Sequence, residues 1–78
     1  MEKLLLNILR ALVQVPEDLD LQEVKGATTT FVEIRCALKD VGCIIGKNGK
    51  TISAIRVLIN ATSRGDETIV LEVIEPDA

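Results

Sequence analysis

The residues best suited to chemistry lie together at positions 44–52, which read IIGKNGKTI. Gly46 and Gly49 bracket Lys47 and Asn48, and this G-x-x-G spacing lets a backbone turn tightly and bare its N–H groups. Amides at the start of a helix, with lysines beside them, are suited to holding phosphate. The segment therefore predicts a loop that binds the phosphates of a ligand.

A nucleotide-binding P-loop is the first alternative, because Gly49-Lys50-Thr51 matches the end of the motif G-x-x-x-x-G-K-[ST]. The first glycine of that motif would fall at position 44, which is Ile44, and the residues before the loop read as helix rather than strand. A chain of 78 residues also leaves no room for a nucleotide-hydrolysing domain. We therefore exclude a nucleotide site.

Catalysis and metal binding lack the residues that they need. The chain has no histidine, so neither a Cys-His nor a Ser-His arrangement can form. Cys36 and Cys43 are too few for a structural zinc site, and Cys43 near the loop is best explained as an incidental thiol. We expect a protein that is not an enzyme and that carries no metal and no cofactor.

The charge of the chain is unevenly distributed. The formal net charge is −3, but residues 34–65 hold six cations against one acid, Asp40, and so carry +5. The remaining residues hold three cations against eleven acids, or −8. Because the local field governs a binding surface more than the total charge does, the loop lies in the segment best suited to an anionic ligand.

Size and composition favour a single folded domain over residues 1–78 with a frayed tail at 75–78, since 47% of the residues are hydrophobic. Phe31 is the only aromatic residue, so stacking of bases on aromatic rings cannot be the main binding mode. No apolar run reaches the length of a membrane span, and two cysteines fit a reducing compartment. We expect a cytoplasmic protein with no membrane partner.

The spacing of the apolar residues predicts three helical segments and three strands. The helical segments are expected at residues 2–14, at 39–45 as a short helix or turn, and from the loop, where Asn48 can act as a cap, to about Ser63, with Arg64-Gly65 as a stop. The strands are expected at residues 19–25, 29–38 and 67–74. The order is therefore αββααβ.

This order predicts an α+β fold, with the helices packed on one face of a three-stranded mixed sheet. The last two strands are separated by a helical crossover and should be parallel, whereas the first two join through Gly26-Ala27-Thr28 and should be antiparallel. The side chains expected to face the core are Val32, Ile34, Cys36, Leu38, Ile69, Leu71 and Val73 of the strands and Ile52, Ile55, Leu58, Ile59 and Thr62 of the last helix.

Two further faces are predicted from the same periodicity. The last helix should turn its polar side chains away from the core, namely Ser53, Arg56, Asn60 and Arg64. The uncovered face of the sheet should expose Phe31, Val70 and Ile74. These three apolar residues suggest a partner surface.

The glycine loop between two helices, within an αββααβ order, resembles the type II KH domain. The KH signature is an apolar pair, G-x-x-G, and an apolar residue three positions later, and it is matched here by Ile44-Ile45-Gly46-Lys47-Asn48-Gly49-Lys50-Thr51-Ile52. The segments VKGATTTFVEIRCAL and KDVGCIIGKNGKTISAIRVLINA extend the likeness. Over essentially the whole chain it is similar to small stand-alone bacterial KH proteins of the KhpA (YlqC) family.

The resemblance implies that the chain binds single-stranded RNA, with about four nucleotides clamped at the loop. It implies that Gly46 and Gly49 permit close approach, that Lys47 and Asn48 face phosphates, and that Lys50 and Arg56 add phosphate contacts. The walls of an apolar groove for the bases would be Ile44, Ile45 and Ile52 on the helical side and Val32 and Ile34, or neighbours on that strand, on the other side. Taken alone, Ile45 and Ile52 fit the core better, and Ile44 fits either role. Single-stranded DNA is compatible with the same loop.

The resemblance also implies self-pairing as a homodimer, a KhpB (Jag)-like partner, and a role as RNA chaperone or regulator in cell-envelope growth and cell shape. The chain departs from the family at Cys43, where a basic residue is often found, and in its overall acidity. Both departures predict weak binding by one domain, with avidity from a partner. The alternative is a KH-fold protein-interaction module with little RNA affinity.

Overall fold

The computed structural model describes residues 2–62 and 67–76, and within them it contains three α-helices and three β-strands. In chain order these are α1 (Glu2–Leu12), β1 (Asp20–Lys25), β2 (Thr29–Arg35), α2 (Leu38–Ile45), α3 (Lys50–Thr62) and β3 (Thr68–Ile74). Short 3-10 turns lie at Pro16–Asp18 and Lys47–Gly49. The predicted α+β class and the αββααβ order are confirmed.

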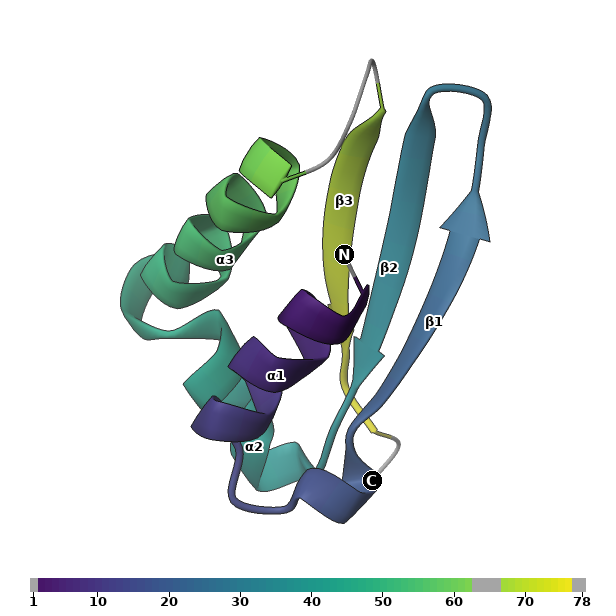
Figure 1. Ribbon diagram of the computed structural model, residues 1–78. Helices are drawn as coiled ribbons and strands as arrows, with labels where there is room; N and C mark the ends of the chain where they lie inside the picture. Colours follow the sequence, from purple (N-terminus) through teal and green to yellow (C-terminus); the bar gives the residue numbers. More distant parts are fainter. Residues whose placement is uncertain (1, 63–66, 77–78) are drawn as a thin grey trace.

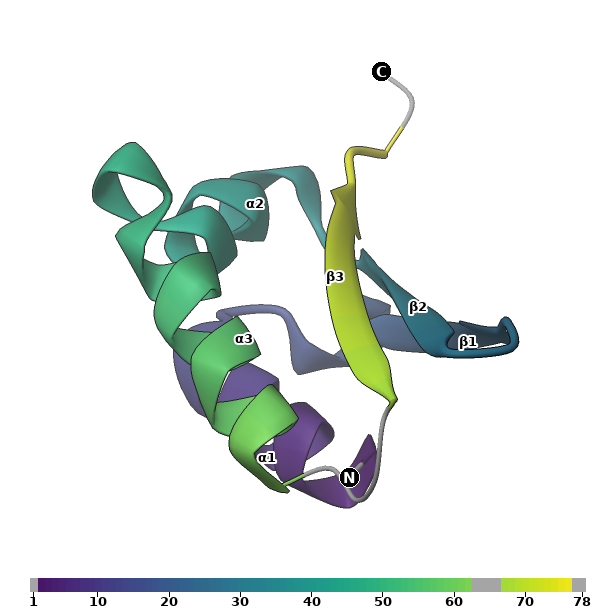
Figure 2. The same cartoon turned by 90° about the horizontal axis from the view of Figure 1, so that it is seen from above.

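The three strands form one mixed sheet in the order β1-β2-β3, as Figure 1 shows. Strands β1 and β2 are antiparallel, and β2 and β3 are parallel, as predicted. Seen from above, the helices lie on one side of the sheet (Figure 2). Strand β2 is therefore central, whereas β1 and β3 are edge strands, and no helix of the described ranges covers the second face of the sheet.

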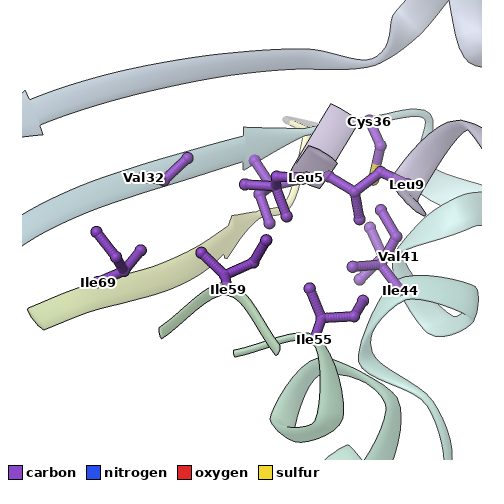
Figure 3. Packing of buried hydrophobic residues seen from close by; sticks show 10 residues of the cluster. Leu5, Leu9, Val32, Cys36, Val41, Ile44, Ile55, Ile59 and Ile69 are labelled. Atoms are coloured by element: carbon purple, nitrogen blue, oxygen red, sulfur yellow. The ribbon is translucent and has the colours of Figure 1, made fainter. Parts of the chain in front are cut away.

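The core lies between the helices and the covered face of the sheet (Figure 3). Its fully or nearly fully buried side chains are Leu5, Leu9, Val32, Ile34, Cys36, Val41, Ile44, Ile55, Ile59 and Ile69. Ile52, Leu71 and Val73 are half-buried against this cluster. The alternation predicted for β2 and β3 is thus confirmed within the two strands, because strand side chains point to opposite faces in turn.

Three residues assigned to the core from the sequence lie on the surface instead. Leu38 is 62% exposed, because β2 ends at Arg35 and Leu38 is the first residue of α2. Leu58 is 54% exposed and Thr62 is exposed. Leu58 directly precedes the buried Ile59, and one residue corresponds to about 100° around an α-helix, so it lies outside the narrow stripe that meets the sheet.

Asp40 is completely buried, which the sequence did not indicate. Its Oδ1 accepts a hydrogen bond from the N–H of Gln14 at 2.9 Å, and its Oδ2 accepts one from the N–H of Val15 at 2.9 Å. These two N–H groups follow α1, which ends at Leu12 rather than at the predicted residue 14. The carboxylate of α2 therefore ties that helix to the segment that leaves α1.

Parts of the sequence prediction fall outside the described residues: the helix end at Ser63, the stop at Arg64-Gly65, and the tail residues 77 and 78. Glu75 and Pro76 follow the end of β3 without regular structure. None of the helices in the described part of the chain is long and apolar enough to cross a membrane.

Candidate nucleic-acid interface

The glycine loop, residues 46–49, is a tight turn between α2 and α3 that projects from the helical layer on the side away from β1 (Figures 1 and 2). Three of its residues have positive φ: Gly46 at 76°, Asn48 at 57° and Gly49 at 72°. Asparagine is one of the few residues with a side chain that tolerates this left-handed region. The composition of the loop thus matches the backbone conformation that it adopts.

The two glycine N–H groups of the loop form hydrogen bonds within the chain, whereas the two N–H groups between them do not. The N–H of Gly46 binds the carbonyl of Gly42 at 2.8 Å and ends α2, while the N–H of Gly49 binds the carbonyl of Gly46 at 3.2 Å. The N–H groups of Lys47 and Asn48 bind no group among the residues that the structure describes. Two neighbouring N–H groups at the tip of the turn are therefore available to an anion.

The expected N-cap role of Asn48 is wrong. Helix α3 begins at Lys50, so the residue that flanks it is Gly49. Asn48 lies inside the 3-10 turn with φ 57° and ψ 28°, and no hydrogen bond from its side chain to the backbone of α3 is formed. Its exposed side chain is free to face a ligand.

The two glycines differ in how crowded they are. A Cβ on Gly46 would overlap the side chain of Thr51 and would lie 2.9 Å from the Thr51 backbone nitrogen. A Cβ on Gly49 would meet nothing within 4 Å. Gly46 is therefore required by the packing of the turn against α3, whereas the space beside Gly49 is open to solvent or to a ligand.

Exposed cations lie at the loop and along the helix that follows it. Lys47 and Lys50 are exposed at the turn, and Arg56 is exposed further along α3. Asp40, the acid of the basic segment, is buried with its carboxylate bound by two N–H groups, so it forms no surface ion pair with these cations. Arg35 lies on β2 with its guanidinium Nη2 3.3 Å from Glu33 Oε1, and is not part of this group.

The predicted apolar walls must be corrected. Val32, Ile34 and Ile44 have no exposed surface, so their side chains cannot contact a base in this conformation. They belong to the core: Val32 and Ile34 point from β2 to the face that the helices cover, and Ile44 lies on α2 in the same buried cluster. Ile45 and Ile52 are half-buried beside the loop and remain able to contact a ligand.

Strand β3, not β2, has an edge whose backbone groups pair with no neighbouring strand, because β3 lies at the end of the sheet. The N–H of Thr68 binds the carbonyl of Thr28 within the sheet, so the peptide groups of Ile69, one residue later, point to the open edge. By the same alternation, Leu71 and Val73 also direct an N–H and a carbonyl to this edge. Figures 1 and 2 show the glycine loop on the side of the molecule away from β1, and β3 is the edge strand opposite β1, so the loop and this edge belong to one side of the molecule.

Hollows elsewhere on the described surface do not involve the loop. One is lined by residues of β2, α2 and the end of β3, including Arg35, Leu38 and Ile74. Another lies between α1 and β1, around Leu6 and Leu21.

The two thiols have different surroundings. Burial raises the pKa of the Cys36 thiol above its ordinary value, and the nearby Asp40 and Cys43 raise it further. Cys43 is exposed on α2. Among the described residues, no group of three or more histidine, cysteine or acidic side chains could hold a metal ion.

The αββααβ order, the mixed sheet covered on one face, and the G-x-x-G turn between α2 and α3 together define a type II KH domain. The comparison with protein families is specific: a family model described as KhpA/KhpB, KH domain, matches residues 2–73. The chain belongs to this family, which is not a family of enzymes.

Curated relatives match over nearly their full length. The RNA-binding protein KhpA of Chlamydia trachomatis is 42% identical over 76 residues, which cover 96% of this chain and 97% of that protein. The proteins of the same name from Listeria monocytogenes and Clostridium acetobutylicum are 38% and 35% identical, over 96% and 95% of this chain and 100% of each relative. No solved structure gives a significant match.

Proposed function

We propose that this protein binds single-stranded RNA, with the sugar–phosphate backbone clamped at Gly46-Lys47-Asn48-Gly49. The observation that carries the proposal is the pair of free N–H groups at Lys47 and Asn48, on an exposed turn whose neighbouring surface charges are cationic. Backbone amides and lysines hold phosphate without regard to sequence. The names of the curated relatives as RNA-binding proteins support the same ligand.

The bases would lie beside the loop, between the half-buried Ile45 and Ile52 and the open edge of β3. Leu71 offers a peptide N–H and a carbonyl side by side at that edge, and a base edge presents a matching acceptor and donor. Lys50 and Arg56 would contact further phosphates. This arrangement keeps the helical wall inferred from the sequence and moves the strand wall from β2 to β3.

Charge reversal at the loop tip tests the clamp. The double variant Lys47→Asp with Asn48→Asp places two carboxylates where phosphates are proposed to bind, and it should abolish binding of a short single-stranded RNA measured by fluorescence anisotropy. The matched control is Lys3→Asp with Asn7→Asp, which makes the same two chemical changes at exposed positions of α1. The control should retain most of the affinity.

Two outcomes would contradict the proposal. One is parent-like affinity in the folded loop variant, and the other is an equal loss in both variants, which would indicate a response to net charge alone. A DNA oligonucleotide of the same sequence, titrated in parallel, measures the preference for RNA. In the cell we propose a role as an RNA chaperone or post-transcriptional regulator linked to cell-envelope growth, as the family resemblance implies.

We further propose that the chain forms a homodimer or pairs with a KhpB-like protein. Such contacts could cover two groups of apolar residues that lie at the described surface. On the open face of the sheet, Phe31 is 42% exposed and is paired in register with the exposed Val24 and with Val70. Val70 and Ile74, expected from the sequence to be exposed, are half-buried on the same face. On α3, Val57 is 66% and Leu58 is 54% exposed.

Sizing chromatography with Phe31→Glu and with Leu58→Glu distinguishes the two groups. A charge in the centre of the true interface should shift the protein to the monomer volume, whereas the other variant serves as the control and should elute as the parent does. An unchanged oligomer in both variants would exclude both groups. If the dimer persists but the parent fails to bind RNA, the protein-interaction function gains support over the RNA-binding one.

A further inference from the structure

The side chain of Asn60, expected from the sequence to face solvent, is instead bound to the edge of β3. Its Nδ2 donates to the carbonyl of Ile69 at 3.0 Å, and its Oδ1 accepts from the N–H of Ile69 at 2.8 Å. Nδ2 also donates to the carbonyl of Arg56, one turn earlier in α3, at 2.9 Å. The carboxamide therefore bridges the backbone of α3 and the backbone of the edge strand.

This pairing imitates a neighbouring strand. A residue of an added parallel strand would offer Ile69 the same acceptor and donor that the carboxamide offers. Ile69 is fully buried, so its N–H and carbonyl would otherwise lack partners at a costly position. Asn60 thus occupies the first N–H and carbonyl that point to the open edge of β3. The next N–H and carbonyl at this edge belong to Leu71.

Asn60 also connects the strand edge to the loop. It lies on α3, the helix that begins directly after Gly49, and a helix of this length moves as a rigid rod. A bidentate bond near its end fixes how far α3 stands from β3. The separation between the glycine loop and Leu71 depends on that distance.

We propose that Asn60 is a positioning and specificity-determining residue for single-stranded nucleic acid. It blocks the Ile69 position of the strand edge, so that a base held at the loop pairs at Leu71 in one register. This inference rests on the proposed function. Without the carboxamide, the N–H and carbonyl of Ile69 are free to pair with a base, which gives a second register two residues before Leu71.

The test compares Asn60→Ala with Thr62→Ala. Thr62 donates from Oγ1 to the carbonyl of Ile59, so its variant also removes a side-chain hydrogen bond near the end of α3, but one that stays within the helix. Affinity is measured for tetranucleotides of each of the four bases and for an abasic tetranucleotide, whose backbone can reach the loop but which has no base to read. Amide hydrogen exchange reports the N–H of Ile69.

In Asn60→Ala, the affinity ratio between the best and the worst base should fall by about fivefold, the equivalent of one neutral hydrogen bond. Affinity for the abasic oligonucleotide should stay within twofold of the parent, and exchange at Ile69 should accelerate. Thr62→Ala should keep the parent's ratio. A merely structural role would weaken all five oligonucleotides equally and would overturn the proposal.

Asn60→Asp guards against failure of the alanine variant to fold. Its carboxylate can still accept from the Ile69 N–H but cannot donate to the two carbonyls, so only the Ile69 carbonyl is freed and the base ratio should fall by less than in the alanine variant. An unchanged ratio in the folded Asp variant, or a parent with no base preference, would overturn the inference. If the parent binds no RNA at all, the proposed function fails instead, and the loop variant at Lys47 and Asn48 identifies that case.

Discussion

Replacing each loop glycine by alanine should separate what the fold requires from what the ligand requires. Both residues have positive φ, where an added side chain costs about 1–2 kcal/mol. Gly46 also has ψ of 174°, a combination adopted almost solely by glycine. Its new Cβ would in addition press on Thr51, whose backbone nitrogen at 2.9 Å belongs to the first turn of α3 and cannot move alone.

The two substitutions therefore differ in magnitude. For Gly46→Ala, strain of about 1–3 kcal/mol adds to an overpacking penalty of similar size, so a loss of about 3 kcal/mol is expected. For Gly49→Ala, only the φ term applies, or about 1 kcal/mol, because nothing lies within 4 Å of the new atom. In a domain of this size, each kcal/mol corresponds to roughly 4–8 °C in Tm.

The direct effect on RNA affinity should be larger in Gly49→Ala than in Gly46→Ala, the reverse of the order for stability. In Gly49→Ala the methyl group occupies the open space through which a phosphate backbone would approach, so RNA affinity should fall about tenfold in a protein that is still folded. In Gly46→Ala the affinity should fall with the folded fraction. Thermal melts by circular dichroism and anisotropy titrations on the same samples give both quantities.

Either of two results would refute this reasoning. Equal Tm losses in the two variants would mean that the contact with Thr51 does not govern the turn. Parent-like RNA affinity in Gly49→Ala would mean that the ligand backbone does not pass beside Gly49.

Asp40→Asn should cost about 2 kcal/mol in a urea titration, because an amide offers one acceptor to two N–H groups, and an unchanged midpoint would contradict this. At pH 7, a thiol reagent should modify Cys43 in the folded protein and Cys36 only after unfolding. The pKa of Cys36 is raised in the folded state, so the unfolded state loses the thiol proton first as pH rises past the ordinary thiol pKa of 9.0. The free energy of unfolding should therefore fall above that pH, and Cys36→Ala should remove this fall. Lys47→Ala should reduce the slope of log affinity against log salt by about 0.7.

Much of the fold could be predicted because its signals are local. The alternation of Val32 and Ile34, and of Ile69, Leu71 and Val73, sets the face of each strand whatever its neighbours are. The helical crossover between β2 and β3 then requires a parallel pair. The glycine loop could also be predicted, because a positive φ is adopted mainly by glycine and asparagine, and these are the residue types found in it.

Burial of individual apolar residues was harder to predict. Leu38 and Leu58 are as hydrophobic as the core residues, but three helices and three strands cannot cover every apolar side chain of so short a chain. Which ones remain exposed depends on where β2 stops and on which side of α3 meets the sheet. Neither is encoded in the periodicity alone.

The polar residues show why the site could be predicted only in part. The side chain of Asn60 binds the backbone of a residue 9 positions away, and that of Asp40 binds backbone groups 25 and 26 positions away. The residues next to them in the sequence give no sign of these hydrogen bonds. The sequence places the strand wall on β2 because the alternation of apolar residues is clearest there, although the predicted pairing already makes β2 the central strand. Once β3 is known to be the edge strand, Leu71 rather than Val32 lies within reach of a ligand.

The parallel pairing of β2 with β3 has a consequence for folding and for ligand response. Helix α2, the glycine loop and α3 all lie in the connection between these two strands. Closing that connection costs chain entropy that is recovered only when the helices dock and the strands pair together, so the turn and the sheet should form in one cooperative step. A ligand held at the turn therefore stabilises the sheet by mass action, and a defect far away in β3 weakens the apparent affinity by depleting the folded population.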